Sequence, residues 1–230
     1  MNKAITQPVT YRFNPHGDHV LVEVAGKWLM IDTGADLTVG NTALFEFGGL
    51  PFPCVQNYFG FTVDGLTKFI GHQVDYLVGL RVLQHFPFII NWDRKEISFF
   101  PPGHEFEGGT VVPLRRGAGG LLVYFPLKFD GRPVEAVFDT GCPISYMPRI
   151  EGTPDGTADD FYPGFGTWTT QLYRNHVEFG DRGFDMKFGI IPEGCLLKTA
   201  TPWLCGGAFL KSGPIGFDIA RNRLHLFSNN

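Results

Sequence analysis

The residues best suited to chemistry are two aspartates that occur in the same short motif. Asp-Thr-Gly is found at Asp32–Gly34 and again at Asp139–Gly141, each time after a run of apolar residues. Two carboxyl groups held side by side cannot both ionise readily, so one keeps a proton while the other acts as a base. Such a pair can deprotonate a water molecule and protonate a departing amine without a metal or a covalent nucleophile. The two motifs therefore predict hydrolysis by an activated water.

The glycine of each motif suits this arrangement. Gly34 and Gly141 have no Cβ, so the backbone can approach the carboxyl groups closely and point N–H groups at them. A single Asp-Thr-Gly is also a common plain turn, because aspartate and glycine both favour turns. Two such turns at the ends of buried strands are a different case, since burying two carboxylates without a function costs free energy.

The two motifs belong to a longer internal repeat. In each half we expect a strand hairpin before the motif, a short helix after a later apolar-apolar-Gly sequence, and a closing pair of strands. An ordered series of matches indicates a duplicated half, whereas a single match would not. The four landmarks and their counterparts are Val20–Ile31 with Leu122–Phe138, Asp32–Gly34 with Asp139–Gly141, Leu77–Gly79 with Leu204–Gly206, and Ile90–Phe100 with Ile215–Phe227.

The composition favours many short strands joined by tight turns. Among 230 residues there are 30 Gly, 17 Pro and 23 Phe, which is high for a helical protein, and we expect an all-β fold. The formal net charge is -4 and the basic residues are scattered, so no basic stripe for nucleic acid is present. Nucleic acid and membrane are therefore not expected as partners.

We place the boundary between the halves in the segment 101–109, where Pro, Gly and charge replace the apolar alternation. Residues 1–102 then form an N-terminal lobe and residues 103–230 a C-terminal lobe. The C-terminal half has extra residues between its Asp-Thr-Gly and Gly206. We expect them in a polar, turn-rich loop at Glu151–Asp160.

Two copies of Asp-Thr-Gly in a repeated framework resemble the pepsin and retropepsin superfamily of aspartic peptidases, and the resemblance spans nearly the whole chain. It implies a bilobal pepsin-like fold with pseudo-twofold symmetry, in which Asp32 and Asp139 meet on the floor of a cleft. It also implies that Thr33 and Thr140 bond across to the opposite loop. Asp36 resembles a retropepsin position that binds the substrate backbone.

The family covers its cleft with a β-hairpin flap. We interpret Val55–Ile70 as that hairpin, with its tip at Asp64-Gly65. Tyr58 and Phe61 would then face the substrate, although packing of either ring into the core is an equal alternative. In the C-terminal half, Trp168 is a candidate for a pocket wall.

The sequence gives weaker support for two other kinds of chemistry, a metal site and a cysteine nucleophile. His16 and His19 have no third partner at metal-ligand spacing, so we expect no metal and no cofactor. Cys142 follows the second motif, where family members carry Ser, Thr or Ala. No His adjacent in sequence is available to activate its thiol. We interpret all four cysteines as buried free thiols.

The resemblance and the dyad together imply an aspartic endopeptidase that takes a peptide or protein substrate and acts as a monomer. A catalytically silent peptide-binding module of the same fold and a narrow-specificity processing peptidase remain alternatives. The first fifteen residues contain no apolar run of the signal-peptide kind and no later stretch reaches membrane-spanning length, so we expect a cytoplasmic protein.

Overall fold

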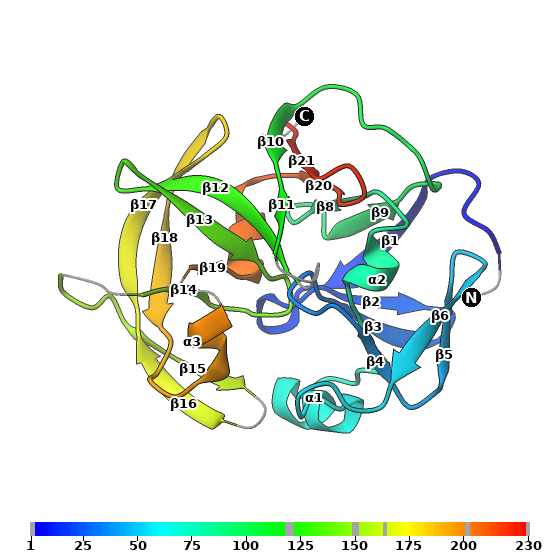
Figure 1. Ribbon diagram of the computed structural model, residues 1–230, viewed down its shortest axis with the longest axis horizontal. Coiled ribbons are helices and arrows are strands. Elements are labelled where there is room, and N and C mark those ends of the chain that lie inside the picture. Colours follow the sequence, from blue (N-terminus) through cyan, green and yellow to red (C-terminus); the bar gives the residue numbers. More distant parts are fainter. Residues whose placement is uncertain (1–2, 118–121, 149–151, 163–164, 201–202, 229–230) are drawn as a thin grey trace.

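The structure is a computed structural model that describes residues 3–117, 122–148, 152–162, 165–200 and 203–228. It is all-β, with two large sheets and a few short helices (Figure 1). In the N-terminal half the strands are β1 (Val9–Asn14), β2 (Leu21–Val24), β3 (Lys27–Ile31), β4 (Thr38–Gly40), β5 (Leu44–Phe47), β6 (Leu50–Val55), β7 (Tyr76–Val78), β8 (Phe88–Asn91) and β9 (Glu96–Phe99). The helices there are the 3-10 turn η1 (His16–Asp18), α1 (Val63–Ile70) and α2 (Leu80–Leu83).

The C-terminal half repeats much of this order. Its strands are β10 (Thr110–Pro113), β11 (Arg115–Arg116), β12 (Val123–Phe129), β13 (Arg132–Phe138), β14 (Ser145–Met147), β15 (Thr157–Tyr162), β16 (Gly166–Gln171), β17 (Tyr173–Phe179), β18 (Arg182–Ile190), β19 (Leu204–Cys205), β20 (Ile215–Asp218) and β21 (Arg223–Leu226). Its helices are α3 (Leu196–Ala200) and the 3-10 helix η3 (Gly207–Ser212).

The larger sheet joins the two halves. It has 12 strands in the order β10-β21-β20-β8-β9-β1-β2-β3-β7-β4-β6-β5. The halves meet where β20 pairs antiparallel with β8, with Ile215 opposite Ile90. The second sheet has seven strands of the C-terminal half, and β15 and β16 form a separate hairpin. Because one core of buried apolar residues also continues across this pairing, the halves are not independent bodies.

The predicted hairpins before each Asp-Thr-Gly are confirmed. β2 pairs with β3 around Ala25-Gly26, and β12 pairs with β13 around Asp130-Gly131. Both residues of each turn have positive φ, at 52° and 74° in the first turn and 46° and 76° in the second. Such turns match the right-handed twist of the strands that they connect. The closing strand pairs β8–β9 and β20–β21 are likewise present.

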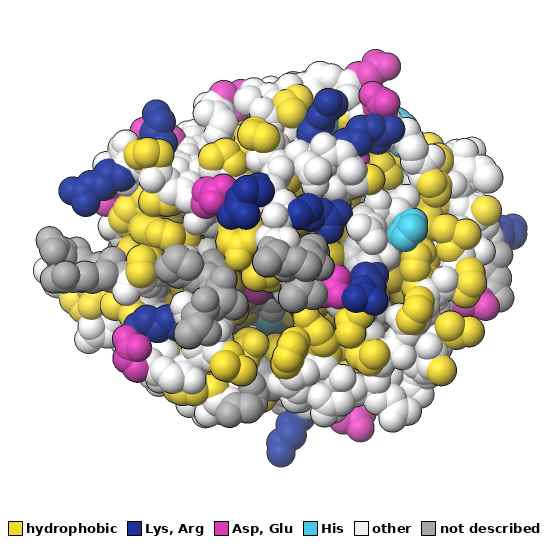
Figure 2. Space-filling model, in the orientation of Figure 1, with side chains coloured by type: hydrophobic (Ala, Val, Ile, Leu, Met, Phe, Trp, Pro, Cys, Tyr) yellow, Lys and Arg dark blue, Asp and Glu magenta, His cyan; other side chains and the backbone are white. Residues whose placement is uncertain are grey.

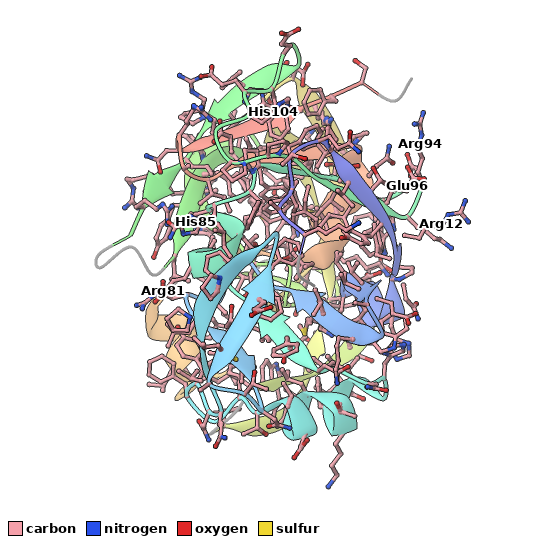
Figure 3. All side chains as sticks on the ribbon, turned by 90° about the vertical axis from the view of Figure 1, so that its right-hand side faces the viewer. Arg12, Arg81, His85, Arg94, Glu96 and His104 are labelled. Atoms are coloured by element: carbon pink, nitrogen blue, oxygen red, sulfur yellow. The ribbon has the colours of Figure 1, made fainter. Side chains whose placement is uncertain are left out.

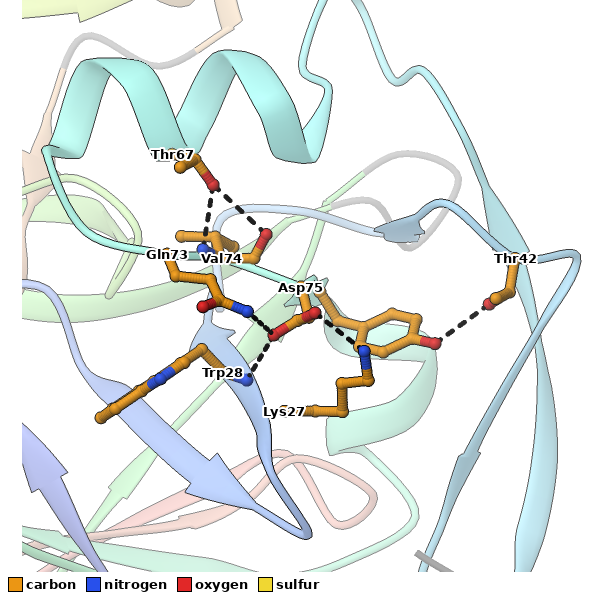
Figure 4. Close-up of polar contacts among 8 residues, drawn as sticks. Lys27, Trp28, Thr42, Thr67, Gln73, Val74 and Asp75 are labelled. Atoms are coloured by element: carbon orange, nitrogen blue, oxygen red, sulfur yellow. Dashed lines mark hydrogen bonds and ion pairs between the residues drawn. The ribbon is translucent and has the colours of Figure 1, made fainter.

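A polar network holds the start of β3 against the segment before β7 (Figure 4). The Asp75 carboxylate accepts hydrogen bonds from the Trp28 N–H at 2.9 Å and from Lys27 Nζ at 3.1 Å. Burial alone would raise the pKa of Asp75, but these hydrogen bonds outweigh it and the pKa lies below its usual value. β3 and β7 then run parallel as far as Ile31 and Val78. The next residue, Asp32, therefore lies at the carboxyl ends of these two strands.

The predicted flap hairpin at Val55–Ile70 is wrong. Residues Val63–Ile70 form helix α1, so Asp64-Gly65 lies in the first turn of a helix and not at a hairpin tip. The Thr62 hydroxyl caps this helix by accepting from the Gly65 N–H at 3.1 Å. Val63 and Leu66 face inward at helical spacing, and this period outweighs the local preference of Asp-Gly for a turn.

The predicted polar loop at Glu151–Asp160 is wrong in its second part. Residue 151 lies outside the described residues, but Thr157–Tyr162 form β15, which pairs in full register with β16. Asp160 faces inward and is only 4% exposed. The extra residues of the C-terminal half therefore include an ordered hairpin.

All four cysteines are free and buried, as predicted. Within the described ranges, no helix combines the length and the apolar character needed to cross a membrane.

Candidate active site

The two Asp-Thr-Gly loops occupy equivalent positions at the ends of strands. The Asp32 N–H donates to the Val78 carbonyl at 3.0 Å, and the Asp139 N–H donates to the Cys205 carbonyl at 2.9 Å. Val78 and Cys205 end the strands that run parallel to β3 and β13. Each aspartate is thus fixed by the apolar-apolar-Gly landmark of its own half.

The glycine of that landmark is required by a close contact. A Cβ on Gly79 would lie 2.4 Å from the Leu37 carbonyl oxygen, and a Cβ on Gly206 would lie 2.4 Å from the Cys142 carbonyl oxygen. Any larger residue would therefore push the helix start away from the Asp-Thr-Gly loop. This contact explains why the pattern recurs in both halves.

The threonines interlock the two loops. The Thr33 N–H donates to Thr140 Oγ1 and the Thr140 N–H donates to Thr33 Oγ1, both at 3.1 Å. Each hydroxyl also donates across the interface, from Thr33 to the Phe138 carbonyl at 2.6 Å and from Thr140 to the Ile31 carbonyl at 2.7 Å. Both threonines are fully buried, so these four bonds join the halves directly beneath the aspartates.

The carboxyl groups have matching surroundings. Asp32 Oδ1 accepts from the N–H groups of Gly34 and Ala35 at 2.8 and 3.1 Å. Asp139 Oδ1 accepts from those of Gly141 and Cys142 at 2.9 and 3.1 Å. A hydrogen bond also joins the two carboxyl groups to each other.

Each carboxyl group packs against the glycine of the opposite loop. A Cβ on Gly34 would lie 2.2 Å from Asp139 Cγ, and a Cβ on Gly141 would lie 2.4 Å from Asp32 Cγ. The two motif glycines therefore allow the close approach that the sequence predicts.

The environment keeps a proton on the pair. Burial raises the pKa of Asp32, although the N–H groups of its own loop oppose this. Burial raises the pKa of Asp139 well above its usual value, and the Asp32 charge raises it further. Two carboxyl groups in contact lose their protons as one coupled unit. The arrangement therefore provides a base and an acid at the same point.

A cavity of about 290 Å³ lies over the dyad and is lined by Asp32, Asp139 and mainly apolar side chains. Tyr58, Phe61 and Trp168, the three aromatic residues among the predicted substrate-binding residues, are all in its wall, whereas Asp36 is not. Figure 2 shows the hollow in this face, with hydrophobic side chains gathered along the rim on the α1 side.

The hairpin β15–β16 of the C-terminal half reaches toward α1 (Figure 1), and its residues Phe161, Tyr162 and Trp168 line the dyad cavity. Its Phe161 packs on Phe69 of α1, with ring centroids 4.6 Å apart. The ring of its Tyr162 lies edge-on to the ring of Phe61, with ring centroids 5.6 Å apart. The wall of the cavity on this side is therefore built by both halves.

The Asp36 side chain does not line the dyad cavity. Its carboxylate pairs with Arg81 of α2, accepting from Nε at 3.0 Å and lying 2.8 Å from Nη2, and Asp36 is not among the residues that line the dyad cavity. Arg81 projects from the edge of the molecule in Figure 3. The residue resembling a substrate-binding position thus has its carboxylate in a protein ion pair.

Asp160 is a site residue that the sequence did not single out. Its carboxyl group accepts from the Tyr146 hydroxyl and, at 2.8 Å, from the Phe161 N–H. Burial raises the pKa of Asp160. No alternation of apolar and polar residues marks it in the sequence, because Asp160 takes a buried position of β15 that an apolar residue would usually occupy.

Cys142 is unsuited to nucleophilic chemistry. Its Sγ lies 3.2 Å from the Ile144 carbonyl, and burial raises the pKa of the thiol well above its usual value. A nucleophilic cysteine needs a lowered pKa, because the thiolate attacks. In the described part of the chain, no group of three or more His, Cys, Asp or Glu residues is placed to hold a metal ion.

Comparison of the chain with protein-family models gives no match, and comparison with curated protein sequences gives none either. The site consists of two carboxyl groups in contact, beneath an apolar cavity. Such a pair can activate a water molecule for addition to a carbonyl group.

Proposed function

We propose that the protein is an aspartic endopeptidase with a bilobal, pepsin-like architecture, its lobes being residues 1–102 and 103–230. The observation that carries the proposal is the matched pair of Asp-Thr-Gly loops. Their carboxyl groups are hydrogen-bonded to each other and held by equivalent N–H groups from Gly34 and Gly141. Two plain turns would not need this interlocked, buried arrangement.

The dyad would work with one shared proton. The ionised carboxylate takes a proton from water, whose oxygen attacks the carbonyl carbon of the peptide bond, while the protonated carboxyl group donates to the carbonyl oxygen. The resulting diol then collapses. The C–N bond breaks, the amine nitrogen receives the proton taken from water, and a diol hydroxyl returns a proton to the other carboxylate. The pair is back in its starting state, with no metal, cofactor or covalent intermediate.

The cavity wall supports a peptide or protein as the substrate. Tyr58, Phe61 and Trp168 offer aromatic surface beside the dyad, which favours apolar side chains next to the bond that is cleaved. Both aspartates come from one chain, so a monomer contains the complete dyad. The scattered charge gives no support for a nucleic-acid partner.

A narrow-specificity processing peptidase is favoured over a general one by the hairpin β15–β16. The contact between Phe161 and Phe69 restricts access to the dyad from that side. A catalytically silent peptide-binding module would leave the shared proton and the buried carboxyl pair without a purpose.

The test is digestion of proteome-derived peptides, with the products identified by mass spectrometry. We expect cleavage between large apolar residues. Addition of EDTA or of a thiol-alkylating reagent to the folded protein should leave the cleavage unchanged, since neither a metal nor Cys142 takes part. Absence of any cleavage would refute the endopeptidase, and loss of cleavage with EDTA would point to a metal enzyme instead.

A further inference from the structure

A tight turn at residues 58–61 carries three aromatic residues of the dyad cavity wall. The Tyr58 N–H donates to the Phe61 carbonyl at 3.0 Å, and the Phe61 N–H donates to the Tyr58 carbonyl at 2.8 Å. The two residues between them, Phe59 and Gly60, both have positive φ, at 50° and 93°. The Gly60 N–H also donates to Asn57 Oδ1 at 2.9 Å. These bonds fix the backbone of Phe59 in the left-handed region.

This conformation is unfavourable for phenylalanine. A positive φ brings Cβ close to the backbone, and among residues with a side chain it is tolerated best by asparagine and aspartate. The first position of a two-residue hairpin turn is therefore usually Asn, Asp or Gly. Phe59 is the one aromatic residue among the described non-glycine residues with positive φ. The turn itself would be better formed with another residue at this position.

Packing in the core does not compensate for the strain. Phe59 is 66% exposed, the highest value for any large hydrophobic residue in the described ranges. Its neighbours Tyr58 and Phe61 pack against a cluster of buried residues that includes Met30 and Leu66, but Phe59 does not belong to that cluster. The Phe59 ring lies edge-on to the Tyr58 ring, with centroids 4.7 Å apart. The ring is therefore held in one place while most of it stays in contact with solvent.

The exposed residue belongs to the catalytic cavity. Phe59 lines the cavity over Asp32 and Asp139, so a molecule that enters it reaches this residue. Backbone strain that the fold does not need is typical of functional positions. Covering exposed apolar surface is favourable in proportion to the area removed from water. An apolar side chain of a bound substrate would supply the packing that Phe59 lacks in the free protein.

We propose that Phe59 is a specificity-determining residue, kept in a strained turn because its ring packs on one large apolar side chain of the bound substrate. This inference rests on the proposed peptidase function. Phe59 takes no part in proton transfer and acts on which peptide is bound. The fold should then be more stable with a residue that suits the turn, and the preference for the large apolar side chain should be lost with that change.

Thermal unfolding tests the strain without a substrate. Phe59→Asn introduces a residue that tolerates positive φ, and Tm should rise by about 2–4 °C. Ala25→Asn is the matched control, because Ala25 has a φ of 52° in an equivalent turn with Gly26 and does not line the dyad cavity. It should raise Tm in the same way and leave kcat/KM unchanged. A Tm of Phe59→Asn at or below that of the wild type would contradict the strain.

Cleavage of paired peptides tests the contact. The best peptide from the library is compared with versions in which each apolar side chain is replaced in turn by alanine. At one position the replacement should lower kcat/KM by about tenfold in the wild type and by less than about twofold in Phe59→Asn, since the variant has already lost that contact. With the parent peptide, Phe59→Asn should lose about tenfold through a higher KM, with kcat little changed. Phe59→Leu keeps an apolar side chain and should keep the preference.

The outcomes separate this inference from the peptidase itself. If the wild type and Phe59→Asn respond equally to alanine at every position, or if Phe59→Asn cleaves the parent peptide as well as the wild type does, Phe59 does not determine specificity and the inference is overturned. In both cases the dyad would still be shown to cleave peptides. Failure of the wild type to cleave any peptide would instead refute the peptidase.

Discussion

Asp32 and Asp139 form a site that costs the protein stability. Their pKa values are raised in the folded state, with burial as the largest cause, whereas in the unfolded chain each carboxyl group meets only water. Above the unfolded pKa, the unfolded chain ionises and the folded pair resists doing so. Stability therefore falls as pH rises through that window, up to the folded pKa.

Asp139→Asn should therefore stabilise the fold at pH 7 while removing activity. The amide does not titrate, so the variant escapes the cost of ionising a buried pair, and its Tm should exceed that of the wild type. Near pH 3 the wild-type pair is protonated in both states and the gain should vanish. Thermal unfolding across this pH range measures the difference. Glu23→Gln, an exposed carboxyl change on β2, should show no such pH-dependent gain. A lower Tm for Asp139→Asn at pH 7 would contradict the raised pKa.

At the residue scale, the residues that occur in both halves could be predicted from the sequence. Residues whose place depends on contacts far along the chain could not. The aspartates, the motif glycines and Gly79 with Gly206 are visible as a pattern. The segment that carries His19 is held by a contact of Asp18 with Gly207, which lies far along the chain. Asp36 matches a substrate-binding pattern, but its carboxylate pairs with Arg81, and no local sequence feature predicts that pair.

At the scale of elements, the two Asp-Thr-Gly loops act as one interlocked unit. Thr33→Val removes a buried hydroxyl that donates to the Phe138 carbonyl and accepts from the Thr140 N–H, and valine fills the same space. Two buried groups are left unpaired, so we expect a loss of about 2–5 kcal/mol in the free energy of unfolding. Denaturant unfolding measures it.

The control for this change is Thr10→Val. The Thr10 hydroxyl bonds to Ser98 on the exposed surface at 2.7 Å, where water can replace it. We expect less than about 1 kcal/mol from its loss. Equal effects of the two variants would show that the interlocked threonines do not hold the halves together.

The elements also show where local signals mislead. The dipeptide Asp64-Gly65 alone predicts a hairpin tip. Helix α1 forms instead, because Thr62 caps it and Val63 and Leu66, three residues apart, face the core. The hairpin beside the cavity is formed instead by β15 and β16, whose Phe161 packs on Phe69 of α1. Its strands carry polar residues such as Asp159, which is typical of a loop until the pairing partner is known.

At the scale of the whole molecule, the halves share a sheet and a core. Phe217 of β20 stacks on Phe88 of β8 at 4.6 Å and lies 5.1 Å from Phe138, directly before Asp139. The sequence predicted a duplicated chain with two lobes. It could not predict the pairing of β20 with β8, because strand partners between halves are not encoded in local periodicity.

We expect the chain to unfold in one cooperative transition. Phe217→Ala should lower the free energy of unfolding by about 3–5 kcal/mol, as expected for a fully buried ring, and the transition should stay single because both halves lose packing. Circular dichroism and tryptophan fluorescence during denaturant unfolding should give coincident curves. Two separated transitions in the wild type, or destabilisation of one half alone, would contradict a shared core.

The central claim is that Asp32 and Asp139 act as one acid-base device on water, and kcat/KM of the two Asn variants tests it most directly. With the best peptide substrate, Asp32→Asn and Asp139→Asn should each lose at least about a thousandfold relative to wild type, because either change removes half of a shared unit. Thermal unfolding of the same samples shows that both are folded. Activity within about tenfold of wild type in either folded variant would contradict the claim.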